Sequence, residues 1–213
     1  MRLFEPGEVR VKICGITTLE DARLCIVAGA DALGFNFYSG SVRCISPADF
    51  DWIRGLAGSV DRVAVVVNPT RSLLKELRES GCFEMIQFHG DETPEECGAS
   101  GGSEWIKAVR VRDVDVMRES LVYSTPHILL DAWSPSAYGG TGEVADWAKI
   151  RDFVAEHPSR NFILAGGLKP NNVGEAIQMV APIAVDVAGG VECAPGRKDP
   201  ELVSAFIAAA KCR

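Results

Sequence analysis

The chain has 213 residues, of which 47% are hydrophobic, so it can form one domain, 1–213, with a large core. Its net charge is −7 and it has no basic run, which argues against a nucleic-acid partner. No apolar segment approaches the roughly 18 residues of a membrane span, and the N-terminus has no signal-peptide core. We therefore expect a soluble, cytoplasmic protein without a membrane partner.

A strand-then-helix unit recurs roughly every 25 residues along the chain. Several of the strand candidates are apolar almost continuously, as at 63–67, which is typical of strands buried on both faces of a parallel sheet. The predicted strands are Val9–Ile16, Ala30–Phe37, Arg62–Val67, Phe83–His89, Glu104–Val111, His127–Trp133, Asn161–Ala165 and Ile183–Val187.

The segments between these strands carry helix signals. Thr17 and Glu20 have the spacing of a capping box, and Ser46-Pro47 and Asp199-Pro200 each place a capping residue before a proline at a helix start. The weakest helix pattern follows Glu92, where glycines and serines gather. Apolar residues recur at helical spacing in two sets, Val173, Ala176, Ile177 and Val180, and Leu202, Ala205, Phe206 and Ala209.

Eight alternating units fit either a closed barrel or a doubly wound open sheet. No G-x-G-x-x-G follows the first strand, which disfavours a dinucleotide-binding sheet and gives no sign of a cofactor. The sequence therefore predicts the α/β class and a single (β/α)₈ TIM barrel of eight parallel strands. The seven cysteines are scattered with no C-x-x-C pair, so we expect neither a zinc site nor a redox dithiol, and a reducing compartment fits.

Paired glycines follow two of the last strands, at Gly166-Gly167 and Gly189-Gly190. In a barrel, phosphate is often bound by the loops after strands 7 and 8, where glycine lets backbone N–H groups approach the anion. A helix start at Asn171 or Asn172 would add to this anion site, and Gly142 lies in a further glycine loop after strand 6. Glycines also make ordinary tight turns, but two pairs at these places favour a phosphorylated small-molecule ligand.

Charged and nucleophilic residues end several strands. Lys12 and Cys14 alternate onto the same face of the first strand, and each has the alternative of a purely structural role. Asp131 ends an apolar strand, and Asp186 lies in the last one. The other candidates are His89, more often structural when alone, and Arg43, whose planar fork suits a carboxylate but which is more often a surface residue.

Together these positions resemble the phosphoribosylanthranilate isomerase family. The similar segments are Lys-Ile-Cys-Gly-Ile-Thr at 12–17, Gly-Phe-Asn-Phe-Tyr at 34–38, Ser-Val-Arg-Cys-Ile at 41–45, Ile-Gln-Phe-His-Gly at 86–90, Leu-Leu-Asp-Ala at 129–132, Gly-Gly-Thr-Gly at 139–142, Ala-Gly-Gly-Leu at 165–168 and Val-Asp-Val-Ala-Gly-Gly-Val-Glu at 185–192. The resemblance implies the Amadori rearrangement of N-(5-phosphoribosyl)anthranilate to 1-(2-carboxyphenylamino)-1-deoxyribulose 5-phosphate in tryptophan biosynthesis, without a cofactor or metal.

The resemblance also implies residue roles. Cys14 matches the general base, Asp131 the general acid and Arg43 the residue that holds the anthranilate carboxylate. Substrate-binding positions also include Lys12, Asn36, His89 and Asp186, and phosphate-binding positions are Gly142, Gly166, Gly167, Gly189 and Gly190.

Four residues depart from the family's pattern: Val42 replaces a proline, Cys44 an aromatic residue, and Ala188 and Gly189 a serine pair. The rival interpretations are a histidine-pathway sugar isomerase, which uses an aspartate in place of Cys14, a non-catalytic phosphate-binding barrel and a thiol redox protein. The sequence leaves open whether the protein is a monomer or a homodimer.

Overall fold

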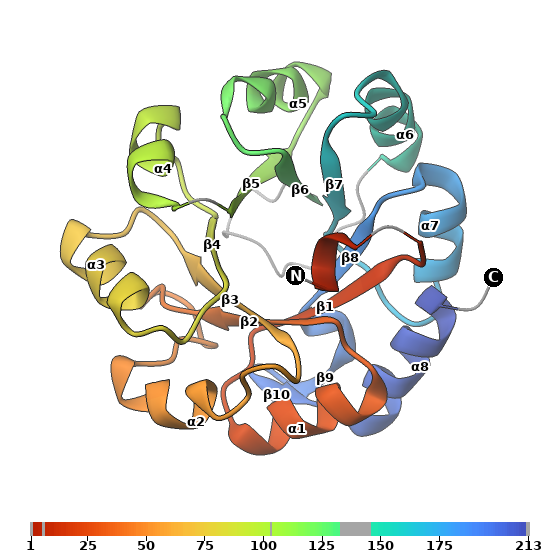
Figure 1. Ribbon diagram of the computed structural model, residues 1–213. Helices are drawn as coiled ribbons and strands as arrows, with labels where there is room; N and C mark the ends of the chain where they lie inside the picture. Colours follow the sequence, from red (N-terminus) through yellow and green to blue (C-terminus); the bar gives the residue numbers. More distant parts are fainter. Residues whose placement is uncertain (1, 6, 103, 133–145, 212–213) are drawn as a thin grey trace.

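The computed structural model describes residues 2–5, 7–102, 104–132 and 146–211. Eight parallel strands close into a barrel in the order β1 to β8, with helices around the outside (Figure 1). The predicted fold class is therefore confirmed, and each predicted strand is present. Four strands are one residue shorter than expected, three are three residues shorter, and one keeps its length but is shifted by one residue. The strands are β1 Arg10–Cys14, β2 Ala32–Asn36, β3 Asp61–Val66, β4 Met85–Phe88, β5 Trp105–Val111, β6 His127–Ala132, β7 Asn161–Leu164 and β8 Ala184–Val187.

Helices follow the strands and cover them. The α-helices are α1 Leu19–Ala28, α2 Phe50–Arg54, α3 Arg71–Glu79, α4 Pro94–Ser100, α5 Val114–Glu119, α6 Trp147–Glu156, α7 Val173–Val180 and α8 Pro200–Lys211. Short 3₁₀ segments are η1 Arg2–Phe4, η2 Pro47–Asp49, η3 Ser120–Val122 and η4 Gly189–Val191. The doubtful helix after Glu92 forms because Thr93 and Glu96 make a capping box and Pro94 occupies its first position. No described helix has the length and apolar character that a membrane span requires.

Two details of the helix predictions are wrong. The cap of α1 is Thr18, whose hydroxyl accepts a hydrogen bond from Asp21 N at 3.1 Å. Thr17 precedes the cap residue, and its hydroxyl instead donates to the carbonyl of Gly196 at 2.7 Å. In α8 the buried face is Val203, Phe206, Ile207 and Ala210, because this helix is apolar almost all round and more than one face fits helical spacing.

Small and medium apolar side chains fill the N-terminal half of the barrel. The inner cluster consists of Leu3, Ala32, Val63, Met85, Ile106, Ala108, Leu129, Ile163, Ala165 and Ala184. The 3₁₀ segment η1 lies across this end of the barrel in Figure 1, with Leu3 fully buried and its N–H donating to Asp61 Oδ2 at 2.9 Å. The Phe4 ring stacks on His127 at a centroid distance of 3.6 Å. Because this end is packed and plugged, ligand access is left to the C-terminal ends of the strands.

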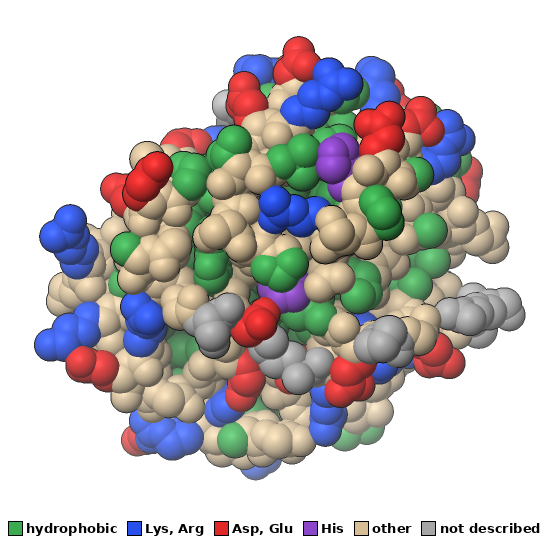
Figure 2. Space-filling model, turned by 45° about the horizontal axis from the view of Figure 1, so that its top comes forward, with side chains coloured by type: hydrophobic (Ala, Val, Ile, Leu, Met, Phe, Trp, Pro, Cys, Tyr) green, Lys and Arg blue, Asp and Glu red, His purple; other side chains and the backbone are tan. Residues whose placement is uncertain are grey.

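The outer surface carries charges of both signs. Figure 2 shows lysine and arginine side chains interspersed with aspartate and glutamate over one face, without a basic stripe among the described residues on that face. The six described cysteines are all free, and Cys44 and Cys193 are the exposed ones.

Candidate active site

Lys12 and Cys14 project into the barrel from β1. The Lys12 side chain is fully buried and its Nζ lies 2.7 Å from Asp186 Oδ1 on the neighbouring strand β8. Cys14 is partly exposed at the rim and pairs in register with Gly34 of β2. A Cβ on Gly34 would lie 2.6 Å from Cys14 Sγ and 3.0 Å from Lys12 Nζ. The glycine therefore makes the space in which the thiol and the ammonium group meet.

Opposing effects act on the pKa of the Cys14 thiol. Burial raises it, the Lys12 ammonium group lowers it, Asp186 raises it and Lys198 lowers it, and the net pKa lies above its ordinary value. For Lys12, burial lowers the pKa, but Asp186 and Cys14 outweigh burial and the net pKa is raised. Lys12 thus remains a cation beside the thiol. The Lys12 charge by itself favours the thiolate, although burial has the larger effect on the pKa of the thiol.

His89 and Asp131 meet at the ends of β4 and β6. His89 Nε2 lies 3.3 Å from Asp131 Oδ2, without hydrogen-bond geometry, and both side chains are buried. Gln87 Nε2 lies 3.0 Å from His89 Nδ1. Because an amide NH₂ only donates, Nδ1 accepts and the ring proton sits on Nε2, facing Asp131. Gln87 lies in the segment 86–90 that resembles the family, but the sequence does not reveal its contact with His89.

Cys14 and Asp131 lie at C-terminal strand ends that are not neighbours. In the closed order β1 to β8, strands β7 and β8 separate β1 from β6 on the shorter side. The thiol and the carboxylate therefore face the barrel mouth from different directions. This arrangement can place a base and an acid on two sides of a ligand that lies across the mouth.

Arg43 is held by Glu192, which Lys198 holds in turn, and the sequence alone does not reveal either role. Its Nε and Nη2 donate to Glu192 Oε1 and Oε2 at 2.8 and 2.6 Å. Glu192 Oε1 also accepts from Lys198 Nζ at 2.8 Å. Glu192 and Lys198 belong to a hairpin after β8, formed by β9 Glu192–Ala194 and β10 Arg197–Lys198. The Pro-Gly pair at 195–196 is the turn signal that could have revealed this hairpin.

The pKa values of this cluster follow the contacts. Hydrogen bonding to Glu192 raises the pKa of Arg43 against the opposing effect of burial. Burial raises the pKa of Glu192, but Arg43 and Lys198 outweigh it and the net pKa is lowered. Arg43 and Glu192 are therefore both charged at neutral pH.

The loops after β7 and β8 pack directly against each other. A Cβ on Gly190 would lie 1.9 Å from the carbonyl oxygen of Leu168. Gly166 and Gly167 have φ of +88° and +66°, a region that favours glycine. No described residue accepts a hydrogen bond from the N–H groups of Gly166, Gly167, Gly189 or Gly190. The two glycine loops therefore lie against each other at the C-terminal ends of β7 and β8.

Asn172 closes one side of this pair of loops. Asn172 directly precedes α7, so it is the correct one of the two helix starts predicted at 171 and 172, but its side chain makes no capping hydrogen bond to the helix. Its Oδ1 accepts from Lys169 N at 2.7 Å and its Nδ2 donates to the Gly167 carbonyl at 3.0 Å. The asparagine therefore orders the glycine loop.

The remaining predicted site residues are Asn36 and Gly142. Asn36 ends β2, and its side-chain oxygen accepts from Tyr38 N at 2.8 Å, so the side chain orders its own loop. Gly142 lies outside the described residues. Within the described ranges, no group of three or more His, Cys, Asp or Glu side chains is placed to hold a metal ion.

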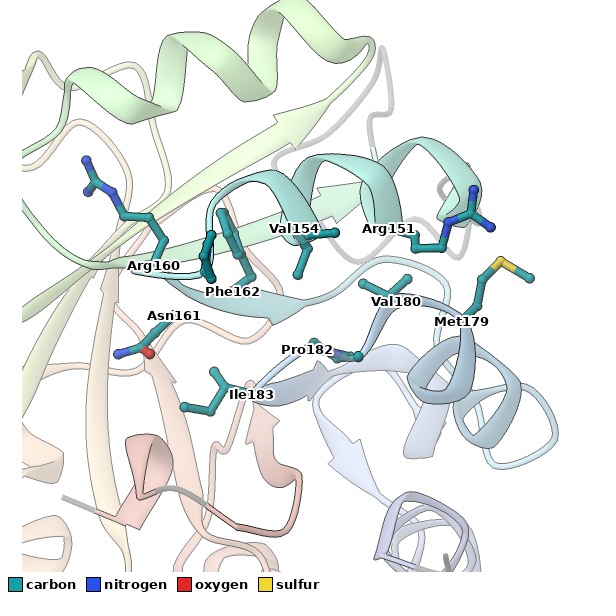
Figure 3. A pocket seen from close by; sticks show the side chains of 12 residues that line it. Arg151, Val154, Arg160, Asn161, Phe162, Met179, Val180, Pro182 and Ile183 are labelled. Atoms are coloured by element: carbon teal, nitrogen blue, oxygen red, sulfur yellow. The ribbon is translucent and has the colours of Figure 1, made fainter.

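A surface groove of about 470 Å³ lies at the opposite end of the strands (Figure 3). Its lining comes from α6, α7 and the starts of β7 and β8, including Asn161 and Ile183. The Arg160 guanidinium beside it already donates to the carbonyls of Leu121, Tyr123 and Thr125. The groove has none of the reactive side chains that gather at the C-terminal ends, so it is not the candidate site.

Comparison with known proteins assigns the family. The family model described as N-(5'-phosphoribosyl)anthranilate isomerase matches residues 11–209. The chain belongs to this family. The N-(5'-phosphoribosyl)anthranilate isomerase of Geobacter sulfurreducens is 46% identical over 204 residues, which cover 95% of this chain and 98% of that protein.

Solved structures of the family have the same fold. The crystal structure of phosphoribosyl anthranilate isomerase from Thermotoga maritima is 42% identical, with a TM-score of 0.87 and coverage of 95% of this chain and 98% of that one. Another structure of a phosphoribosyl anthranilate isomerase, 40% identical with a TM-score of 0.83, holds reduced 1-(o-carboxyphenylamino)-1-deoxyribulose 5-phosphate and has the same coverage, 95% and 98%.

Proposed function

We propose that this chain isomerises N-(5'-phosphoribosyl)anthranilate to 1-(2-carboxyphenylamino)-1-deoxyribulose 5-phosphate, a step of tryptophan biosynthesis. The observation that carries the proposal is the pair of reactive groups, Cys14 beside Lys12 and Asp131 beside His89, on separate sides of one barrel mouth. Family membership supports the same reaction. The described site residues suffice for acid–base chemistry, and the proposed mechanism uses no cofactor.

The first step opens the furanose ring. Asp131 donates a proton to the ring oxygen as the C1–O bond breaks, and the anthranilate nitrogen forms a Schiff base with C1. His89, whose Nε2 lies 3.3 Å from Asp131 Oδ2, stabilises the carboxylate left after transfer.

The second step removes the C2 proton. The Cys14 thiolate takes it, the C2–H electrons form the C1–C2 double bond, and the nitrogen accepts the displaced pair. The resulting enolamine then tautomerises to the keto product. Lys12 stabilises the thiolate that this step requires, because its charge lowers the thiol pKa against burial. Asp186 keeps Lys12 in place through the 2.7 Å ion pair.

The substrate's two anionic groups define its orientation. We assign the phosphate to the four N–H groups of the paired glycines, near the start of α7, where the helix dipole also favours an anion. We assign the anthranilate carboxylate to Arg43. Between these two ends the sugar carbons come to lie at the barrel mouth, within reach of both Cys14 and Asp131. The reducing interior that the free cysteines require is supplied by the cytoplasm, where we place the enzyme.

The proposal is tested by turnover of freshly made phosphoribosylanthranilate, which is monitored as the loss of its anthranilate fluorescence. The histidine-pathway aminoaldose is assayed in parallel. We expect turnover of the first and none of the second, because the described site has one glycine-lined anion site and a cysteine as base. No turnover of phosphoribosylanthranilate would refute the proposed function, and turnover of the aminoaldose alone would establish the rival.

A further inference from the structure

Arg43 carries a guanidinium group whose two edges are not equivalent in this structure. One edge, Nε and Nη2, is paired with both oxygens of Glu192. A guanidinium group has five N–H donors, of which this pairing uses two. No described residue accepts a hydrogen bond from Nη1. The second edge, formed by Nη1 and the remaining N–H of Nη2, therefore keeps a two-pronged geometry that matches a carboxylate.

The backbone around Cys14 fixes the position of the arginine stem. A Cβ on Gly15 would lie 2.4 Å from Arg43 Cδ, and Gly15 has a φ of +77°. The arginine stem therefore lies across the residue that directly follows Cys14. Arg43 is only 17% exposed at its side chain, so the Glu192 contact is not a loose surface ion pair.

Glu192 is in turn held by Lys198. The Lys198 side chain is fully buried, and its ammonium group donates to the carbonyls of Cys14 and Ala188 at 2.7 and 3.2 Å and to Glu192 at 2.8 Å. These three bonds use all three donors of an ammonium group. One buried lysine thus joins the end of β1, the loop after β8 and the hairpin.

We propose that Glu192 is a positioning residue that orients Arg43, so that its free edge receives the substrate's anthranilate carboxylate, and that Lys198 keeps Glu192 in place. The proposal rests on the proposed function, and it identifies the residue that orients Arg43 for its contact with the substrate carboxylate. The charges agree with this assignment. Arg43 and Lys198 carry two positive charges and Glu192 one negative charge, so the cluster retains one positive charge for an incoming anion.

Replacement of Glu192 by glutamine tests the proposal. A glutamine offers one acceptor oxygen where the carboxylate has two, and it turns an NH₂ donor toward one of the two cations. We expect Glu192→Gln to raise KM about tenfold, the magnitude of one lost charge-assisted hydrogen bond, with a much smaller change in kcat. Glu192→Asp keeps the charge but shortens the reach, and it should give an intermediate KM.

Glu84 provides a matched control. It makes the same kind of two-oxygen pair, with Arg62 Nε and Nη2, at the start of β3, far from the reactive side chains. Glu84→Gln should leave KM and kcat near the wild-type values. A shared rise in KM for both variants would show a general structural effect and overturn the assignment.

Two readouts separate a positioning role from a structural one. In an Arg43→Ala background, Glu192→Gln should raise KM no further, since there is no guanidinium group left to orient. Inhibition by inorganic phosphate should be unchanged in Glu192→Gln, because the glycine loops bind phosphate independently. An equal KM increase with and without Arg43, or a lower KM in Glu192→Gln, would overturn the proposal. If the wild-type protein shows no turnover, the proposed function fails, which differs from unchanged kinetics in an active Glu192→Gln variant.

Discussion

Replacement of Lys12 by methionine should reveal how much the buried ion pair contributes to both stability and catalysis. The change keeps the apolar stem but leaves Asp186 without its partner at 2.7 Å, where the Lys12 side chain is 0% exposed and that of Asp186 10%. Removing one partner of a buried ion pair typically costs about 3–5 kcal/mol. For a chain of this size, that corresponds to a fall in the melting temperature of roughly 6–20 °C.

The assay is urea or thermal unfolding followed by circular dichroism, with turnover measured in parallel. Lys75→Met is the control, since Lys75 and Glu79 form an exposed pair at 3.8 Å and their loss should cost no more than about 0.5 kcal/mol. Replacing both partners, Lys12→Met with Asp186→Leu, should restore most of the stability but not turnover. If Lys12→Met unfolds like Lys75→Met, the reasoning from the buried pair is refuted.

The pH dependence of this effect has a defined sign. Burial lowers the pKa of Lys12, but Asp186 and Cys14 raise it by more, so the pKa in the folded state lies above that in the unfolded state. The stability from this group is therefore complete below about pH 10.4 and is lost as the pH rises through the folded pKa. The difference between wild type and Lys12→Met should accordingly narrow only in strong alkali.

Three further predictions concern the rest of the molecule. Gly190→Ala should raise KM strongly, because its Cβ would lie 1.9 Å from the Leu168 carbonyl, whereas Gly98→Ala, with its nearest atom at 3.6 Å, should be tolerated; equal kinetics would contradict the paired-loop site. Arg43→Lys should raise KM at least tenfold, because an ammonium group cannot make the two-pronged contact with a carboxylate, and an unchanged KM would remove Arg43 from the site. Burial lowers the pKa of His127 against the opposing effect of Glu104. As the pH falls, His127 therefore takes up its proton in the unfolded chain before it does so in the folded protein, and the free energy of unfolding should decrease below about pH 6.5. His127→Gln should reduce this pH dependence in unfolding experiments.

The sequence predicts the architecture of this protein well because the signals are local and repeated. Strands buried on both faces read as apolar runs, and Pro47 and Pro200 mark helix starts directly. Where a pattern is ambiguous, the prediction is wrong in detail. The apolar residues of α8 fit two faces, and only packing against α1, α7 and β1 selects the one with Val203 and Phe206.

The candidate site is predictable only in part from the sequence. Lys12, Cys14 and Asp131 are visible because polar groups at the ends of apolar strands need an explanation. Glu192 and Lys198 are not visible in this way, because each is an ordinary charged residue whose importance comes from contacts with Arg43 and the Cys14 carbonyl, 149 and 184 residues away. Likewise, the space at Gly34 becomes meaningful only when strand register places Cys14 beside it.

The most direct test of the account is the kcat of Cys14→Ala and Asp131→Asn, measured together with the binding of a reduced product analogue. Each variant removes one proton-transferring group and leaves the glycine loops and Arg43 in place. The account predicts that kcat falls by about 10²–10⁴-fold in each, the range typical of a lost general base or acid, while analogue affinity is nearly unchanged. A wild-type kcat in either variant would contradict the assigned acid–base pair.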